Sequence, residues 1–261
     1  NGGKTDINIT LDKNIDLTGK DWTPIGTDYD NSYTGTFDGG GHTITGLTVT
    51  TNDKYAGLFG YLGNFNNAAA TVKNVVMDGI QITCNHRSGY AGGVAGYSWG
   101  TIENCSVSGS ISGTIYVGGV AGQTIFGATL TACYATGNVI IEIDRTQNIS
   151  GGGLVGFNDG ISLLSCYATG NVTSTGSSTG YVHIGGFLGD NYITVTACYW
   201  KNNHEQGIGY NKEGIAPEAT KVDGTNVTWQ KAVDAMNTAL QKAGSEWRYE
   251  LKGALPTLRK Q

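Results

Sequence analysis

The residues best suited to chemistry in this chain are cysteines that recur at one position of a repeated phrase. They are Cys105, Cys133, Cys166 and Cys198, while the fifth cysteine, Cys84, lies outside the pattern. Thiolates bind zinc, yet zinc sites usually pair cysteines a few residues apart or place them beside histidine, and this sequence has no such cluster. Equivalent residues of stacked parallel strands lie about 4.8 Å apart and point the same way, a poor geometry for disulfides. We therefore expect a buried ladder of free thiols, with no metal and no cofactor.

A tyrosine follows three of these cysteines, at Tyr134, Tyr167 and Tyr199. Successive residues of a strand point to opposite faces, so inward cysteines predict outward tyrosines that stack as an exposed ladder. A tyrosine ring offers a flat apolar face and a hydroxyl, which suits both sugar rings and protein surfaces. The sequence therefore predicts these three residues as ligand-binding candidates. The alternative is that the ladder only stabilises one face of a sheet through contacts between neighbouring strands.

The cysteines and tyrosines belong to a phrase that is repeated through most of the 261 residues. A clear copy is GGGLVGFNDGISLLSCYATGNV, residues 151–172, and an earlier copy has Val75 at the cysteine position. The last glycine of the first half falls at Gly60, Gly96, Gly122, Gly156 and Gly189, in steps of 36, 26, 34 and 33 residues. A period in this range indicates a solenoid, a propeller or an array.

Each repeat contains about three short apolar segments, and stacking three strands per coil gives a parallel β-helix. We therefore predict an all-β solenoid with repeats near 56–80, 92–112, 118–143, 152–173 and 185–200. The expected inward residues are Val94, Ile102, Cys105, Val107, Val120, Leu130, Cys133, Ala135, Leu154, Leu163, Cys166 and Ala168. Antiparallel hairpins in a sandwich would show the same alternation, but the in-phase period favours the solenoid.

The repeat pattern ends at Trp200, and we predict a solenoid domain over 1–200 followed by a C-terminal cap over 201–261. Within 227–243, Trp229, Val233, Met236 and Leu240 recur at the spacing of an amphipathic helix. The open end of a β-helix exposes strand edges that proteins usually cover. We expect this helix and the segments after it to provide that cover.

The opening of the chain resembles bacterial surface proteins that carry GLUG motifs. The resemblance rests on TPIG, TGTFDGGGHTITGLTV and AGLFGYLG, and on Gly-apolar-apolar-Gly quartets that begin at Gly57, Gly93, Gly119, Gly153 and Gly186. It covers residues 9–200. GLUG repeats also occur upstream of the catalytic domain in the family of IgA-specific metallo-endopeptidases. The resemblance implies a location outside the cell or on a bacterial cell surface.

The sequence argues against several kinds of activity. The endopeptidase zinc site needs His-Glu-x-x-His, and no two of the four histidines, His42, His86, His183 and His204, stand four residues apart. Acidic residues do not recur at one repeat position, as paired catalytic carboxylates on adjacent coils would. The net charge of −5 and the lack of a basic run argue against nucleic-acid binding. No apolar run approaches the length of a membrane helix, about 18 residues.

These observations favour a non-enzymatic, monomeric module for adhesion, from a bacterial cell surface or a secreted protein. Its expected partners are extracellular glycans or host proteins, bound along a face of the solenoid. Two alternatives stay open. One is a carbohydrate-active β-helix enzyme, which clustered carboxylates in a groove would favour. The other is a structural spacer in a larger surface protein, which a smooth polar surface would favour.

Overall fold

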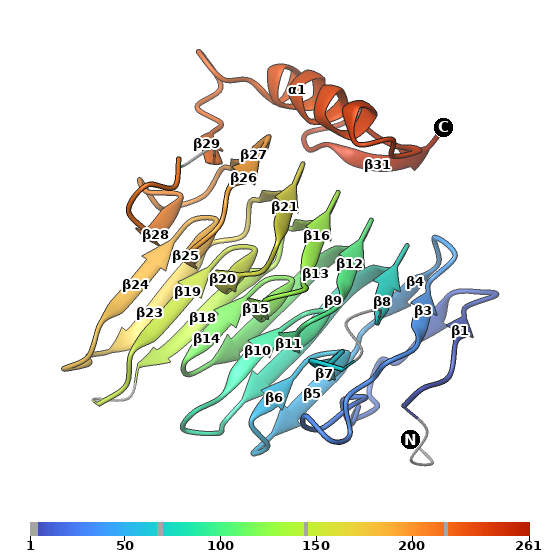
Figure 1. The fold of residues 1–261 in the computed structure, drawn as a ribbon, viewed down its shortest axis with the longest axis vertical. Helices are drawn as coiled ribbons and strands as arrows, with labels where there is room; N and C mark the ends of the chain where they lie inside the picture. The colour runs from blue at the N-terminus through green and yellow to red at the C-terminus, as the bar shows by residue number, and fades with distance from the viewer. Residues whose placement is uncertain (1–4, 67–69, 144–145, 217–218) are drawn as a thin grey trace.

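The computed structural model describes residues 5–66, 70–143, 146–216 and 219–261. It is a parallel β-helix with a small unit of one helix and one hairpin against its side (Figure 1). The strands of four sheets pair in parallel between successive coils, which confirms the all-β solenoid and excludes the antiparallel sandwich. The only antiparallel pair among the described residues is the hairpin of the cap.

Four sheets, named A to D, run along the solenoid. Sheet A contains β1 (Ile9–Thr10), β3 (Thr36–Asp38), β8 (Thr71–Lys73), β12 (Thr101–Glu103), β16 (Thr129–Thr131), β21 (Ser162–Leu164) and β26 (Val195–Thr196). Sheet B contains β2 (Ile15–Asp16), β4 (Thr43–Thr45), β5 (Thr48–Thr51), β9 (Val76–Cys84), β13 (Ser106–Gly113), β17 (Tyr134–Ala135), β18 (Asn138–Ile143), β22 (Tyr167–Ala168), β23 (Val172–Gly176), β27 (Cys198–Trp200) and β29 (Ala219–Lys221). Sheet C contains β7 (Phe59–Leu62), β11 (Ala95–Ser98), β15 (Ala121–Ile125), β20 (Val155–Asp159), β25 (Leu188–Asn191) and β28 (Ile208–Asn211). Sheet D contains β6 (Tyr55–Ala56), β10 (Tyr90–Gly92), β14 (Tyr116–Gly118), β19 (Ile149–Gly152) and β24 (Val182–Gly185).

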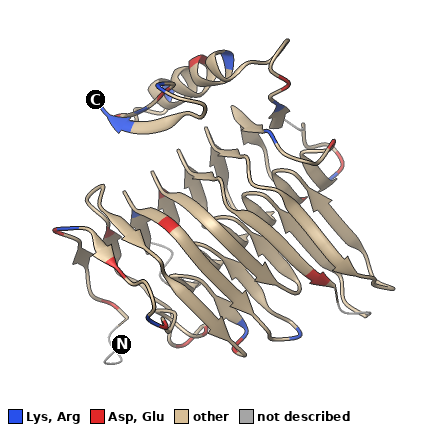
Figure 2. Cartoon of the chain, turned by 180° about the vertical axis from the view of Figure 1, so that it is seen from behind, with Lys and Arg blue, Asp and Glu red and all other residues tan. Residues whose placement is uncertain are grey.

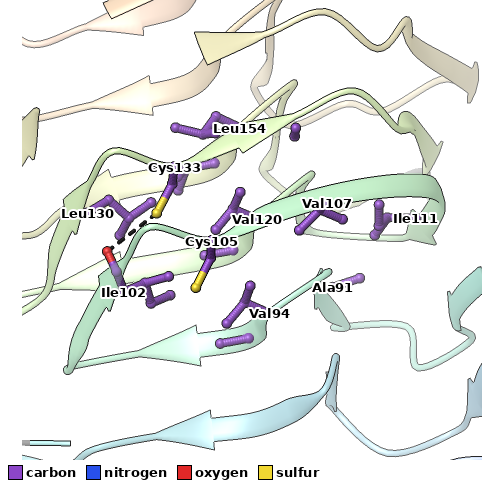
Figure 3. Close-up of a cluster of buried hydrophobic side chains, with 14 of the residues drawn as sticks. Ala91, Val94, Ile102, Cys105, Val107, Ile111, Val120, Leu130, Cys133 and Leu154 are labelled. Carbon is purple, nitrogen blue, oxygen red and sulfur yellow. Dashed lines mark hydrogen bonds between the residues drawn. The ribbon is translucent and has the colours of Figure 1, made fainter. Parts of the chain in front are cut away.

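The core is a stack of equivalent apolar residues from successive coils. Cys105 and Cys133 lie among Ile102, Val120 and Leu130 in Figure 3, and the Cys133 thiol donates to the carbonyl oxygen of Ile102 at 3.4 Å. All four repeat cysteines are free and fully buried, as the sequence predicts. The other expected inward residues are buried as well.

The regular coil has four strands, whereas the sequence predicts three segments. The difference arises because the backbone bends within the segment that contains the cysteine and within the segment that contains the glycine pair, and each bend divides its segment into two strands. The residue before each cysteine, or before Val75, has a left-handed backbone that separates sheet A from sheet B. We call these the corner residues; they are Asn74, Asn104, Ala132, Ser165 and Ala197, with φ between 50° and 57°. The second bend, between sheets D and C, is made by the two consecutive glycines that open a repeat, such as Gly92 and Gly93. A Cβ on Gly92 would overlap the backbone oxygen of Ala95 and lie 2.6 Å from the Cα of Ala121, so only glycine lets the two sheets approach.

The tail differs from the prediction in two ways. The predicted boundary at residue 200 is too early, because β28 pairs with β25 and β29 pairs with β27, which continues the solenoid past Trp200. The predicted helix is α1 (Trp229–Lys242), which begins after the N-cap Thr228. Together with β30 (Trp247–Glu250) and β31 (Thr257–Lys260), α1 forms the cap. The cap lies along the side of the coils, beside the corner residues, rather than across an end (Figure 1).

Candidate binding site

Two of the three tyrosines predicted as an exposed ladder stack on each other, and all three belong to or pack against the apolar cluster under the cap. The rings of Tyr134 and Tyr167 are parallel within 3°, with centroids 4.8 Å apart. Tyr167 is fully buried against the cap residues Trp229 and Tyr249, and Tyr199, 9% exposed, belongs to the same apolar cluster as the cap. The expectation of exposure is therefore wrong for Tyr167 and Tyr199, while Tyr134 is half-buried. Their role in ligand binding stays a prediction, and for Tyr167 and Tyr199 it would require the cap to move away.

Polar contacts hold the cap over these tyrosines. The Ser165 hydroxyl donates to the backbone oxygen of Met236 in α1 at 3.0 Å. The Tyr249 hydroxyl donates back to the backbone oxygen of Ser165 at 2.9 Å. Burial raises the pKa of the Tyr249 hydroxyl well above its ordinary value, so this group remains a neutral donor. The corner residue Ser165 is thus joined to both parts of the cap.

A longer aromatic surface lies on the outer faces of sheets D and C, and we call it the aromatic strip. Its members are Tyr55, Tyr61, Tyr90, Tyr97, Tyr116, Phe157, Tyr192 and Tyr210, with His183 and Tyr181 at the C-terminal end. Each ring contacts the next, so the strip continues across all the coils that have both sheets. The exposure of the rings rises toward the C-terminal end, where Tyr210 is 39% and Tyr181 71% exposed.

The register of the sheets explains why these rings meet. In sheet D, Tyr90 pairs with Tyr55 on one side and Tyr116 on the other. In sheet C, Tyr97 pairs with Tyr61, and their rings stack at 4.5 Å. The bend at the glycine pair folds sheet C back beside sheet D, which places Tyr90 6.0 Å from Tyr97. Aromatic residues from the two sheets therefore form one row along the solenoid, although Gln123 in β15 and Ser150 in β19 occupy the equivalent positions of two strands.

Sequence reasoning missed this strip, although a signal for it is present. An aromatic residue stands two positions before the first glycine at Tyr55, Tyr90 and Tyr116. Another follows the quartet directly at Tyr61 and Tyr97. Reading these two positions as neighbours in space requires the bend between sheets D and C, which the sequence pattern alone does not reveal.

The strip is aromatic and nearly neutral, with cations at its edges. The Lys54 ammonium lies 4.9 Å from the ring centre of Tyr90 and 5.4 Å from that of Tyr55, within range of a cation–π interaction. Burial raises the pKa of Tyr116 to about 12, and it also raises the pKa values of Tyr55, Tyr90 and Tyr97. These hydroxyls are therefore protonated at neutral pH and can both donate and accept hydrogen bonds.

A cavity of about 400 Å³ opens beside the middle of the strip. Tyr90, Tyr116 and Lys54 form its aromatic side, and Ser88, Gln147 and Asn148 are among the polar residues opposite. Aromatic walls combined with a few amide and hydroxyl groups are typical of sites that orient a neutral polar ligand. The cavity therefore extends the strip into a site with both kinds of contact.

A buried carboxylate lies within the C-terminal half of the strip. Asp190 is 7% exposed, accepts a hydrogen bond from the Ser150 hydroxyl, and lies 2.5 Å from the Nδ1 of His183. Burial raises the pKa of Asp190, although the contacts with Ser150 and His183 oppose this shift. Ser150 and His183 both bind the carboxylate rather than each other, so the three residues do not form a serine nucleophile with a histidine base.

Other chemistry finds little support in the part of the chain that the structure describes. No group of three or more His, Cys, Asp or Glu residues there is placed to hold a metal ion. None of the helices there is both long and apolar enough to cross a membrane. The aromatic strip is thus the surface whose geometry is best suited to a function.

The fold defines a repeat protein built as a parallel β-helix. The family model described as "The GLUG motif" matches residues 88–112 and 147–173. Each match spans parts of sheets D, C, A and B, so the motif describes one coil. The chain therefore contains GLUG repeats, as the quartets in its sequence indicate.

Two similar proteins are much longer than this chain. Halomucin of Haloquadratum walsbyi is 37% identical over 124 residues, which is 44% of this chain and 1% of that protein. The "Putative Gly-rich membrane protein" of Evansella cellulosilytica is 35% identical over 100 residues, which is 38% of this chain and 11% of that protein. The matched region is thus a small part of each relative.

A solved structure shares the fold. The crystal structure of a "putative immunoglobulin A1 protease" from Bacteroides ovatus matches with a TM-score of 0.59 and 17% sequence identity. The match covers 98% of this chain and 87% of that one. At this identity the likeness shows the fold alone. It extends over the cap as well as the solenoid, because almost the whole chain is covered.

Proposed function

We propose that this chain is a binding module of a secreted or cell-surface protein, and that it holds an extracellular glycan along the aromatic strip. The observation that carries the proposal is the unbroken row of ring contacts from Tyr61 to Tyr181 across successive coils. The names Halomucin and Gly-rich membrane protein support a role at a cell surface.

The chemistry of the strip suits a neutral, elongated ligand. Sugar rings have apolar faces that pack on aromatic rings and hydroxyls that exchange hydrogen bonds with tyrosine and amide groups. Tyr90 and Tyr116 supply the rings beside the cavity, and Gln147 and Asn148 supply amides. Figure 2 shows most of the strands uncoloured by charge, with charged residues scattered mainly at turns and on the cap. A charged polymer would find few partners on such a surface.

The test is an array of host, plant and microbial glycans probed with the parent chain and two variants. Tyr90→Leu/Tyr116→Leu keeps apolar volume in the strip but removes two flat rings and two hydroxyls. Phe65→Leu/Phe126→Leu removes two exposed rings that lie outside the strip, and it is the matched control. We expect the parent and the control to bind a glycan that the strip variant loses. Thermal melting followed by circular dichroism verifies that each protein is folded.

Two outcomes would contradict the proposal. Binding retained in full by a folded Tyr90→Leu/Tyr116→Leu variant would move the site away from the strip. If the folded parent binds nothing on the whole array, glycan binding would be excluded and a role as a structural spacer would be favoured. A carbohydrate-active enzyme is less well supported, because Asp190 is paired with Ser150 and His183 rather than with a second carboxylate.

A second candidate function is binding to an extracellular protein through an apolar ridge. Phe65, Phe126 and Ile161 are 74%, 65% and 67% exposed, and they follow the sheet C strands β7, β15 and β20. Phe126 has φ 45°, an uncommon conformation for a bulky residue, and its ring stacks on Trp99 at 5.2 Å. Exposed apolar groups gathered in one place commonly mark protein contacts. Retention of an extracellular protein by the parent, lost in Phe65→Ser/Phe126→Ser but kept in Tyr90→Leu/Tyr116→Leu, would support this function.

A further inference from the structure

A column of polar side chains runs along the first corner residues and ends abruptly. The Asn74 amide donates from Nδ2 to Asp38 Oδ1 at 2.9 Å, and the Asn104 amide donates from Nδ2 to Asn74 Oδ1 at 3.3 Å. In the following coil the corner residue is Ala132, which has no polar side chain to continue the column. Asn104 is therefore the last amide of the series.

Asp38, at the start of this column, fixes which group donates and which accepts in each of its hydrogen bonds. Asp38 also accepts from the backbone N–H of Gly40 at 2.9 Å and pairs with Lys73 at 3.5 Å. Partial burial alone would raise the pKa of Asp38, but the contacts from Asn74, Gly40 and Lys73 hold it below its ordinary value. An ionised carboxylate only accepts hydrogen bonds, so Asn74 must turn its NH₂ group toward Asp38. The Asn74 side-chain oxygen then faces Asn104, so Asn104 must donate to it from its own NH₂ group.

The consequence is a buried acceptor without a partner. The Asn104 side-chain oxygen has no hydrogen-bond partner, and it is the one such buried side-chain atom among the residues that the structure describes. Asn104 is 6% exposed. Flipping its amide would not help, because two oxygens would then face each other at Asn74. An unmatched buried acceptor is costly, so a group that donates to it would be bound favourably.

Asn104 also lines a cavity between the solenoid and the cap. Its inner part has a volume of about 120 Å³ and is lined by Asn104, Asn74, Ser106, Tyr134 and Trp247, among others. A wider outer part of about 380 Å³ shares Asn74, Asn104 and Trp247 and reaches the charged residues Glu103 and Lys260. The inner part alone holds more than one water molecule. There is room for a ligand group larger than one solvent molecule.

We propose that this cavity is a second binding site, separate from the aromatic strip, and that it takes a neutral monosaccharide unit that donates a hydroxyl to Asn104 Oδ1. The acceptor needs a donor, and the neighbouring indole of Trp247 and ring of Tyr134 offer flat apolar surfaces for a sugar. The cations at the mouth already have partners, because Lys260 pairs with Glu246 at 2.9 Å and Lys73 with Asp38. A neutral ligand therefore fits the site better than an anion does.

The experiment measures binding of five free sugars by saturation-transfer NMR, followed by calorimetric titration of any sugar that binds. The sugars are glucose, galactose, mannose, N-acetylglucosamine and N-acetylgalactosamine. The test variant is Asn104→Ala, and alanine is compatible with this corner because Ala132 and Ala197 occupy the same position with φ 53° and 50°. The control variant is Tyr90→Leu/Tyr116→Leu, which alters the strip and leaves the cavity intact.

We expect at least one sugar to bind the parent and the strip variant equally, and to lose about tenfold or more in affinity with Asn104→Ala, as for a hydrogen bond to a buried acceptor. Equal binding by the parent and Asn104→Ala would overturn the proposal. So would an absence of binding by all five sugars to the folded parent, which would leave the cavity to water alone. Loss of binding in the strip variant but not in Asn104→Ala would assign the sugar to the strip and would also overturn it.

Discussion

The Tyr167 hydroxyl donates a hydrogen bond of 2.5 Å to the backbone oxygen of Pro256, 89 residues further along the chain. This contact joins the middle of the solenoid to the loop between β30 and β31. Both groups are buried, so neither has water as a substitute partner. The pair explains why a tyrosine at the outward face of sheet B serves the packing of the cap.

Replacing Tyr167 with phenylalanine should therefore weaken the cap. Tyr167→Phe removes the donor and leaves the Pro256 oxygen buried without it, which we expect to lower the free energy of unfolding by about 1–3 kcal/mol. Urea denaturation followed by circular dichroism measures the change. The matched control is Tyr210→Phe, where the ring is 39% exposed and water can replace the contacts. Equal stability of the two variants would show that the Pro256 contact contributes nothing.

The cysteine column should be inert in the native protein. Burial raises the pKa values of Cys105, Cys133 and Cys166 well above the ordinary thiol value, which suppresses the reactive thiolate. We expect Ellman's reagent at pH 8 to leave the repeat cysteines of the folded chain unmodified over minutes, and to titrate all 5 cysteines in guanidinium chloride. Fewer than five thiols in the denatured protein would reveal a disulfide and refute the ladder of free thiols.

The glycine pair should tolerate no side chain. Gly92→Ala places a Cβ against the backbone of Ala95 and Ala121, where no flexible side chain can give way. We expect a loss of stability of about 1–3 kcal/mol or more, as for an overpacked core. Gly253→Ala is the control, because a Cβ there meets nothing within 4 Å and the backbone is not left-handed. Similar melting temperatures for the two variants would mean that sheets D and C are less tightly apposed than described.

As the pH rises, the free energy of unfolding of the parent should fall relative to that of Asp190→Asn. Its pKa in the folded chain is raised by burial above the ordinary value of 3.8. At a pH between the ordinary pKa and the raised pKa, the folded state binds more protons than the unfolded state does. The free energy of unfolding therefore falls as the pH increases. The difference between the two proteins, measured by urea denaturation from pH 3.5 to 7, should shift steadily against the parent. A shift in the opposite direction would show that Ser150 and His183 outweigh burial.

The sequence predicts the solenoid well because each coil repeats the same chemical pattern. Ile102, Leu130 and Leu163 can be aligned by eye, and the structure pairs them in register. The fate of Tyr167 could not be predicted in this way. Its burial depends on Tyr249 and Pro256, which lie outside the repeats and reach it only through the path of the cap. Periodicity reports what successive coils share, and it carries no information on what a non-repeating segment covers.

The aromatic strip was missed for a related reason. Tyr90 and Tyr97 are seven residues apart, and a strand pattern alone places them on separate segments. Their contact at 6.0 Å exists because the backbone reverses around Gly92 within that interval. The orphaned oxygen of Asn104 was equally hidden, because it depends on hydrogen-bond directions that begin at Asp38. Both features arise from geometry between segments rather than from the order of residues.

Parallel stacking in register also makes the length of the strip proportional to the number of coils. Each added coil would lengthen it by one strand spacing, about 4.8 Å, without changing the cross-section of the solenoid. If the strip binds a glycan chain as proposed, duplication or loss of a single GLUG unit would alter the length of chain that one molecule contacts. The strength of attachment could be graded by copy number, while the chemistry of each individual step stayed the same.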